Sequence, residues 1–316
     1  PEYDIPMVLV NSNTYGGSGG PIAVATTEAS SAAIMEHELG HSFVRLTDEY
    51  DTSTPGYPAT EFPNATAKTR RSDIRWKIWI DQDTPLPTPE NNFNFSDKVG
   101  LFEGANYRDK NWYRPHDDAL MRSLFRPPGS VTREAFVLKY YSKISPIDSR
   151  SPGALTQTIN TKRTLYFRVE TKVPSTGPAL TINWFLDGHP TGETGVQFST
   201  ESASIGNGTH RIKAVVRDPT DWVRRDPLAS VVEEVTWTLQ LSNQIDPPVL
   251  NNPLPESPLV LALGSGLSLN AEASGPGPIR YEWLKNDKPF KPAKTTPALA
   301  ISNLTFNDAA TYTVKI

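Results

Sequence analysis

The hydrophobic pattern of the chain changes near residue 152, and this change limits the folds that the chain can adopt. From about residue 28 to residue 46, apolar residues recur at the spacing of one helical face. After residue 152 they alternate in short runs separated by turn signals, which is typical of a β-sandwich. We therefore expect a mixed α/β (α+β) domain over 1–150, followed by an all-β sandwich over 151–245.

A proline-rich joint over 246–258 leads to a second set of alternating runs, which predicts a third domain over 246–316. These runs lie at 259–263, 267–273, 279–284, 299–304 and 311–316. The chain ends at Ile316 before a final strand, which leaves open whether this domain is truncated.

Trp283 and the segment from Asp308 to Tyr312 make the third domain resemble the immunoglobulin-like family. Trp283 lies where that family buries the tryptophan of strand C, and the segment from Asp308 to Tyr312 resembles its tyrosine corner. Ala271 and Val314 lie where the family places its disulfide cysteines, so we expect apolar packing there instead of a covalent bridge.

Few regular elements are predicted in the first 150 residues besides the helix over 28–46. That helix is expected to bury the stripe of Ala32, Met35, Leu39, Phe43 and Leu46. The apolar run at 7–10 predicts a strand, and the glycine cluster at 15–20 predicts a tight loop. Residues 74–80 predict a strand within a region of loops, and 131–142 predict a second helix with Thr132 as N-cap.

Charge and composition exclude several classes of protein. The formal net charge is −4 and no block of basic residues is longer than Arg70-Arg71, so we expect no nucleic-acid partner. No apolar run approaches the ~18 residues of a membrane span. The chain has no cysteine, so any metal site must use histidine or oxygen ligands and no disulfide can form.

The motif that carries chemistry is His37-Glu38-Leu39-Gly40-His41, which lies inside the predicted helix of 28–46. Histidines at i and i+4 share one helical face and can bind one zinc ion. Glu38 is offset from both and is free to take a proton from a water molecule as that water attacks a carbonyl group. The motif therefore predicts one catalytic zinc ion, with His37 and His41 as ligands and Glu38 as general base.

A catalytic zinc ion needs a third protein ligand and an open position. The downstream candidates are Asp48, Glu49, Glu103, His116, Asp117 and Asp118. In a straight helix Asp48 would lie about 10 Å beyond His41, so the chain must leave the helix just after Phe43 if Asp48 is to return. We prefer Asp48 as the third ligand and keep Glu103 and His116 as its competitors. Glu103 is alternatively a partner of backbone groups in its own turn, and His116 a residue that lines the cleft.

The segment from His37 to Tyr50 resembles the signature of the IgA peptidase family of zinc metallopeptidases, which belongs to the metzincin-like group. Further blocks resemble motifs of that family in the same order. They lie at 9–20, 74–79, 100–107, 113–115 and 121–122. The resemblance covers about residues 5–140 and does not reach the β-domains.

The resemblance implies a metzincin-like zinc endopeptidase in which Met121 is the methionine of the turn beneath the metal. It also implies a third ligand after a sharp turn, although Val44 and Arg45 stand where relatives can carry glycine. Tyr107 and Tyr113 are candidates for donors in the substrate cleft, because a tyrosine hydroxyl can stabilise an oxyanion.

These observations predict a zinc metalloendopeptidase that hydrolyses internal peptide bonds of a protein or peptide substrate. The alternative is an adhesive or matrix-binding protein with an inactive peptidase domain and functional immunoglobulin-like modules. The β-domains are expected to bind protein or glycan, or to act as spacers. The chain starts at Pro1 without a signal segment, and we expect it to be part of a longer, secreted, bacterial-type extracellular protein.

Overall fold

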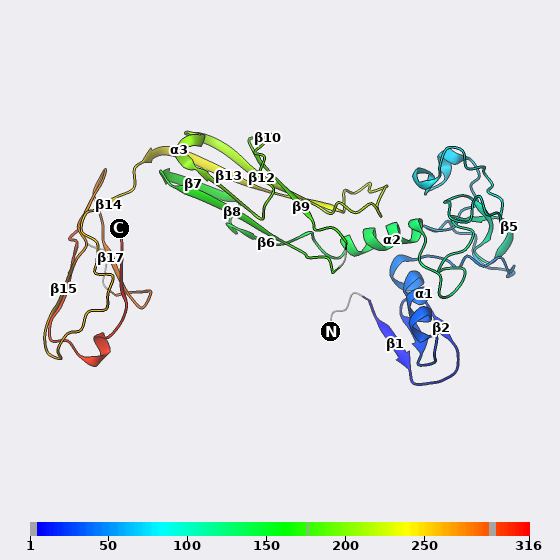
Figure 1. Ribbon diagram of the computed structural model, residues 1–316, viewed down its shortest axis with the longest axis horizontal. Helices are drawn as coiled ribbons and strands as arrows, with labels where there is room; N and C mark the ends of the chain where they lie inside the picture. The colour runs from blue at the N-terminus through cyan, green and yellow to red at the C-terminus, as the bar shows by residue number, and fades with distance from the viewer. Residues whose placement is uncertain (1–4, 176, 291–294) are drawn as a thin grey trace. The chain divides into compact units, whose positions relative to one another are not determined.

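The computed structural model describes residues 5–175, 177–290 and 295–316, and these residues are mostly β-structure with few helices (Figure 1). The chain divides into two compact units. Unit 1 comprises Pro1–Ser149, Glu170–Ile182 and Val215–Glu234, and unit 2 comprises Arg150–Val169, Asn183–Ala214 and Val235–Ile316. The domain boundaries expected at residues 150 and 245 stay a prediction.

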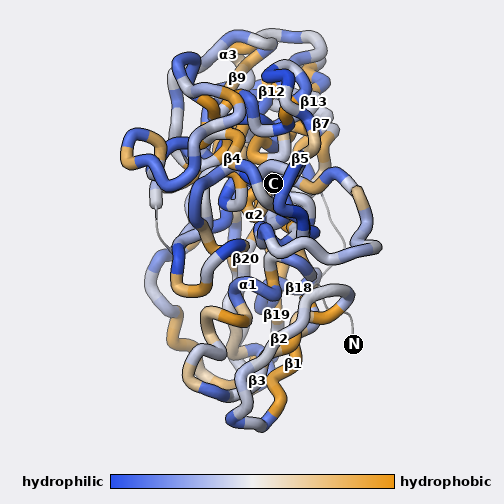
Figure 2. The backbone as a smooth tube through the Cα atoms, turned by 90° about the vertical axis from the view of Figure 1, so that its right-hand side faces the viewer, coloured by the Kyte–Doolittle hydropathy of each residue, from blue (hydrophilic) through white to orange (hydrophobic). Residues whose placement is uncertain are grey.

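A small mixed sheet begins unit 1. Strand β3 (Ala23–Thr26) lies between β1 (Met7–Val10), to which it is parallel, and β2 (Gly17–Ser18), to which it is antiparallel. The predicted strand at 7–10 is confirmed, and all four of its residues are exposed, forming one hydrophobic stretch in Figure 2. The glycine cluster is more ordered than the predicted loop, because two of its residues pair with β3.

Helix α1 (Ser31–Val44) confirms the principal helix of the sequence, but the predicted buried stripe is wrong in part. Ala32 is exposed and Met35 and Leu39 are only half-buried. The buried face holds Ala33, Ile34, His37, Glu38, Gly40, Phe43 and Val44. The spacing of apolar residues did not predict this face, because two of its buried residues, His37 and Glu38, are titratable.

Residues 74–80 do not form the predicted strand. They follow one short 3₁₀ turn, η1 (Arg71–Asp73), and include another, η2 (Lys77–Trp79). Ile74, Trp76 and Ile80 are nonetheless buried, and Trp76 Nε1 donates to the Gly100 carbonyl at 2.9 Å. The apolar side chains of this segment therefore pack into a hydrophobic core although the segment does not form a strand.

Two further elements complete the part of unit 1 that comes before residue 150. A hairpin of β4 (Phe102–Ala105) and β5 (Arg108–Arg114), which the sequence did not predict, turns at residues 106 and 107. Helix α2 (Ser130–Tyr141) confirms the second predicted helix, but it begins after Gly129, so Thr132 is not its N-cap. Helix α2 contacts α1.

The segment 218–231 of unit 1 packs against α2. Glu134 Oε1 accepts hydrogen bonds from the backbone N–H groups of Arg224 (2.6 Å) and Arg225 (2.8 Å). The Arg224 guanidinium lies 4.1 Å from the ring centroid of Trp79, and the Tyr141 hydroxyl donates to Asp218 at 2.6 Å. This segment links β12 to β13, so a connection between two strands helps to build unit 1.

The region 147–245 contains two sheets. The five-stranded sheet has the order β10-β9-β12-β13-β7 and the three-stranded sheet the order β11-β8-β6. Their bounds are β6 Ile147–Ser151, β7 Thr156–Thr161, β8 Thr164–Thr171, β9 Thr181–Leu186, β10 His189–Pro190, β11 Gln197–Glu201, β12 Gly208–Arg217 and β13 Val232–Ile245, with a short helix α3 at Ser202–Ile205. The aromatic rings of Phe167, Trp184, Phe198 and Trp237 pack together in the core. Strands β8, β9, β12 and β13 confirm the short alternating runs expected after residue 152, and the polar strands β6, β7, β10 and β11 were not predicted.

The last region contains three small sheets. Strand β14 (Val249–Leu250) pairs with β16 (Ala273–Ser274), and β15 (Leu267–Asn270) pairs with β19 (Ala298–Ile301). The third has the order β18 (Lys288–Pro289), β17 (Glu282–Lys285) and β20 (Tyr312–Lys315), and a 3₁₀ turn η3 (Phe306–Asp308) precedes β20. The strand predicted at 259–263 is wrong, because these residues form no strand.

The core of this region agrees with the expected immunoglobulin-like packing. Trp283 is buried with Leu269, Ala271 and Leu299, and Val314 packs against this cluster. The Tyr312 hydroxyl donates to the Asp308 carbonyl at 3.1 Å, as in a tyrosine corner. Among the described residues, no helix has the length and apolar character needed to cross a membrane.

Candidate metal centre

His37 and His41 lie one turn apart on α1, and their Nε2 atoms are 3.1 Å apart. The other ring nitrogen of each histidine faces a backbone carbonyl oxygen. Nδ1 of His37 lies 3.0 Å from the oxygen of Leu120, and Nδ1 of His41 lies 2.9 Å from the oxygen of Leu46. Because a carbonyl oxygen only accepts, each Nδ1 carries the proton, and in a neutral ring Nε2 then keeps its lone pair.

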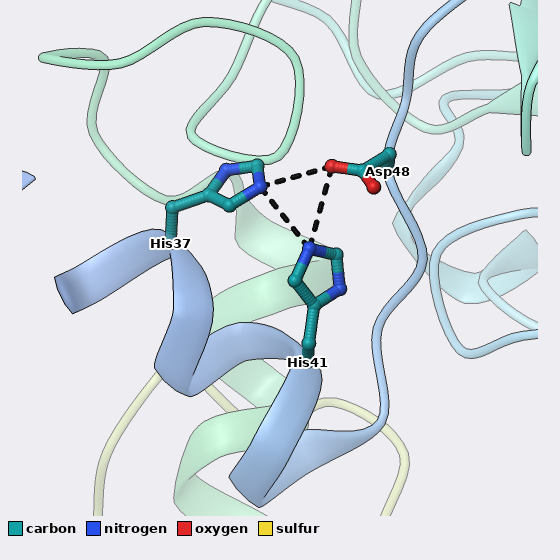
Figure 3. A group of neighbouring side chains, drawn as sticks. All are labelled: His37, His41 and Asp48. Atoms are coloured by element: carbon teal, nitrogen blue, oxygen red, sulfur yellow. Dashed lines mark hydrogen bonds and ion pairs between the residues drawn. The ribbon is translucent and has the colours of Figure 1, made fainter. Parts of the chain in front are cut away.

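Asp48 completes the group that Figure 3 shows. Its Oδ1 lies 2.9 Å from Nε2 of His37 and 3.3 Å from Nε2 of His41. Two imidazole nitrogens and a carboxylate oxygen therefore converge on one point, and this arrangement is stable only with a proton on an imidazole or with a cation among the three atoms. Within the described residues, this is the group of histidine and acidic side chains that could hold a metal ion.

The size of this triangle fits a zinc ion. Ligand atoms about 2.0 Å from a tetrahedral zinc ion lie about 3.3 Å from each other. The three observed separations of 2.9, 3.1 and 3.3 Å are close to that value. Burial raises the pKa of Asp48, but hydrogen bonds from His37, His41 and Tyr107 outweigh it and hold the pKa well below its usual range. Asp48 is thus ionised, as a metal ligand must be.

A left-handed turn brings Asp48 back to the histidines. Arg45 ends α1 with φ 60°, and its N–H bonds to the His41 carbonyl. The next N–H, of Leu46, returns to the Gly40 carbonyl at 2.9 Å, and Leu46 is buried. The chain therefore leaves the helix where the sequence required it, and a non-glycine residue takes the strained position.

Glu38 lies in the same cleft. It is 9% exposed, and burial raises its pKa against the opposing effect of the two histidines. A Cβ atom added at Gly17 would lie 2.8 Å from Glu38 Oε1, and one added at Gly19 would lie 2.8 Å from His41 Cδ2. The glycines of β2 and its loop thus let this strand approach the two functional side chains.

The cleft has a volume of about 730 Å³, and four tyrosines contribute to its wall. Besides His37, Glu38, His41 and Asp48, it is lined by Tyr15, Tyr50, Tyr57, Tyr107, the glycines at 16, 17, 19 and 20, Ser18, Ile34, Leu46 and Leu124. Burial, together with the charge of Asp48, raises the pKa of Tyr50 to about 12. Tyr15, Tyr50 and Tyr57 were not predicted as site residues, although Tyr15 lies in the block at 9–20 and Tyr50 ends the segment that resembles the family signature.

Met121 is fully buried and packs beneath α1 with Phe43, Val44, Leu46 and Leu120. A Cβ atom at Gly40 would lie 2.6 Å from its sulfur, so the glycine of the motif makes room for the methionine. The carbonyl of Met121 accepts the N–H of Glu49 at 2.9 Å. Met121 therefore packs against the helix that carries the motif, and its role as the methionine of a turn beneath the metal stays a prediction.

Three of the other predicted site residues, Glu103, His116 and Tyr113, lie apart from the three-residue group. Glu103 pairs with Lys110 and accepts the Asn111 N–H at 3.0 Å, and Nε2 of His116 accepts the Ser130 N–H at 3.0 Å. Tyr113 is buried in the core with Ile74 and Trp76. The structure therefore brings Asp48, but not Glu103 or His116, to His37 and His41.

The remaining acidic candidates have other partners. The Glu49 side chain is fully buried, and its Oε1 accepts from Asn64 at 3.0 Å. Asp117 contacts Arg114, and Asp118 pairs with Arg126. Tyr107 is the one predicted cleft tyrosine that reaches the group, through a 2.5 Å hydrogen bond from its hydroxyl to Asp48 Oδ2.

Comparison with protein families gives a match over the first part of the chain. Residues 1–98 match the family described as IgA Peptidase M64, which indicates a peptidase. None of the curated proteins matches the chain.

Solved structures give weak likenesses to all-β modules. An I-band fragment of titin is 14% identical over 51% of this chain and 56% of that chain, with a TM-score of 0.22. Fibronectin(III)-like modules of CbhA from Clostridium thermocellum are 13% identical over 52% of this chain and 90% of that chain, with a TM-score of 0.26. The chain thus spans just over half of the titin fragment, and both TM-scores are too low to decide the fold.

Proposed function

We propose that this chain is a zinc metalloendopeptidase of metzincin-like type, in which His37, His41 and Asp48 hold one zinc ion and Glu38 is the general base. The observation that carries the proposal is the convergence of the two Nε2 atoms and Asp48 Oδ1 within 3.3 Å of one another. The family match over residues 1–98 supports it.

The chemistry divides between the ion and the chain. A bound zinc ion supplies Lewis-acid polarisation and lowers the pKa of a coordinated water toward about 7. The Leu120 and Leu46 carbonyls fix the two imidazoles so that Nε2 faces the ion. Glu38 takes the proton of the attacking water and returns it to the leaving amine, a role for which its raised pKa suits it.

The cleft supports a protein or peptide substrate. Glycines and tyrosines make up much of its wall, and they can face an extended backbone and its side chains. We further propose that the protein acts outside the cell and that the β-domains bind protein or glycan or act as spacers.

Zinc content tests the metal site. We expect about one zinc ion per wild-type chain and loss of zinc in His41→Ala and Asp48→Ala. Glu103→Ala and His116→Ala should retain the ion, because these side chains have other partners. A wild-type chain that stays metal-free after incubation with zinc would contradict the proposal.

Glu38→Gln tests the chemistry apart from the metal. This variant should keep zinc and lose hydrolysis of a denatured protein, by about 10²-fold or more, because the amide cannot take the proton. Equal activity of Glu38→Gln and the wild type would overturn the enzyme assignment. A zinc-loaded wild type without any hydrolysis would favour the alternative of a binding protein with an inactive peptidase domain.

A further inference from the structure

The tip of the β4–β5 hairpin lies on the residue that would be the third ligand. Its two turn residues, Asn106 and Tyr107, both have φ 54°. Such two-residue turns favour glycine at the second position, where a side chain is strained. A tyrosine in this backbone conformation costs free energy. Such a strained conformation persists only where contacts with the surrounding structure stabilise it.

Asn106 ties the hairpin tip to the chain on either side of the Asp48 side chain. Its N–H donates to the Asp48 carbonyl at 2.9 Å, and its Oδ1 accepts from the Thr47 hydroxyl at 2.9 Å. Its Nδ2 donates to the Pro58 carbonyl at 3.1 Å. Asn106 and Thr47 are both fully or almost fully buried, so these bonds are sheltered from water.

The Tyr107 side chain then reaches the carboxylate itself. Its hydroxyl donates to Oδ2 of Asp48 at 2.5 Å, while Oδ1 of the same carboxylate faces the two histidines. The Tyr107 ring is held by Tyr57, at 4.4 Å between centroids, and by Tyr50 in an edge-to-face contact at 5.7 Å. The hydroxyl is thus directed by contacts on both sides.

We propose that Tyr107 is a positioning residue for the metal centre: its hydroxyl occupies Oδ2 of Asp48, so that only Oδ1 is presented to the ion, and the Asn106 turn holds the hydroxyl in place. The inference rests on the proposed zinc site and assigns Tyr107 a role different from that of an oxyanion donor. A hydrogen bond to the distal oxygen of a ligating carboxylate orients the ligand, and loss of such a partner lowers metal affinity by roughly 10–100-fold.

The test is zinc affinity by competition with a chelator, for wild type, Tyr107→Phe and Tyr57→Phe. Tyr107→Phe keeps the ring and removes the hydroxyl, so zinc should bind roughly 10–100-fold more weakly. Tyr57→Phe is the matched control, because its ring packs on Tyr107 but its hydroxyl does not bond to Asp48. Thermal unfolding of the metal-free proteins should differ little between the two variants.

A second variant keeps the test valid if Tyr107→Phe does not fold. Thr47→Val removes the hydroxyl that bonds to Asn106, but it removes no atom of Tyr107 or of the three candidate ligands. Zinc should again bind more weakly, because the turn that positions Tyr107 has lost a hydrogen bond. The inference is overturned if folded Tyr107→Phe or folded Thr47→Val binds zinc as tightly as wild type. It is also overturned if Tyr57→Phe lowers the zinc affinity as much as Tyr107→Phe does. A wild type without zinc would instead overturn the proposed function, so the two failures are distinguishable.

Discussion

His116 shows how one neutral side chain can begin a helix. Its Nε2 accepts the N–H of Ser130, the first residue of α2, and a Cβ atom at Gly129 would collide with its ring. Burial, together with the charge of Arg133, lowers the pKa of His116 to about 4. A histidine that accepts a hydrogen bond at a helix N-terminus must stay neutral, and the Nε2 lone pair that caps the helix is not available to a metal ion.

This pKa predicts a loss of stability in acid. Between the ordinary pKa of 6.5 and about 4, the unfolded chain binds a proton at His116 that the folded chain does not. Stability should therefore fall as pH falls through this window, by on the order of 2–3 kcal/mol. Urea unfolding at pH 7 and pH 4.5 measures it. His116→Gln should flatten this dependence, and exposed His189→Gln should keep the wild-type slope; equal slopes in all three would contradict the assignment.

At the level of elements, β2 depends on glycine at defined positions. Gly17 and Gly19 lie against Glu38 and His41, whereas a Cβ atom at Gly16 would meet nothing within 4 Å. Gly19→Ala should push β2 away from α1, weaken zinc binding and destabilise unit 1 by about 1–3 kcal/mol. Gly16→Ala is the control and should bind zinc as the wild type does. A Gly19→Ala variant with unchanged zinc affinity and melting temperature would refute the close approach.

The segment 218–231 supplies a prediction about helix α2. Glu134 accepts the N–H groups of Arg224 and Arg225 with one oxygen, and Glu134→Ala would leave both without that acceptor. We expect a loss of about 2 kcal/mol of local stability. Trypsin should then cleave after Arg224 and Arg225 faster than in the wild type. Glu134→Gln, which keeps an acceptor oxygen, should be intermediate, and equal cleavage rates in all three would count against the contact.

The sequence predicts a contact well when the two residues are close in the chain, and poorly when tertiary packing brings distant residues together. The spacing of His37 and His41 is fixed by helix geometry, so the motif predicts their shared face directly. The return of Asp48 depends on a left-handed turn at Arg45, which the sequence requires but does not indicate by a glycine. Tyr107 and the carbonyl of Leu120 approach through tertiary packing, and no local pattern contains that information.

At the level of the whole molecule, the alternating strands were predictable and the irregular core was not. The strands at 164–171 and 181–186 carry an apolar face with period two, whereas 74–80 is equally apolar but is wound into turns. The polar strands of the sandwich, such as β6 and β7, are set by their neighbours rather than by their own composition.

Trp283 tests whether the two compact units behave separately. It is 4% exposed in the core of the last region, so Trp283→Ala should cost about 3–5 kcal/mol in the unfolding of that region. Zinc content and zinc affinity, which belong to unit 1, should stay as in the wild type. Differential scanning calorimetry with parallel metal analysis checks both, and a loss of zinc in Trp283→Ala would show that the units are coupled.

The hydrogen bond between Tyr107 and Asp48 also has a consequence for the order of events during synthesis. The three candidate ligands lie within residues 37–48, but Tyr107 follows Asp48 by 59 positions. At the usual rate of translation these positions take roughly 3–12 s to emerge. By the proposed roles, a nascent chain binds the ion first through the three ligands alone, and it binds the ion roughly 10–100-fold more tightly once the hairpin has closed over Asp48.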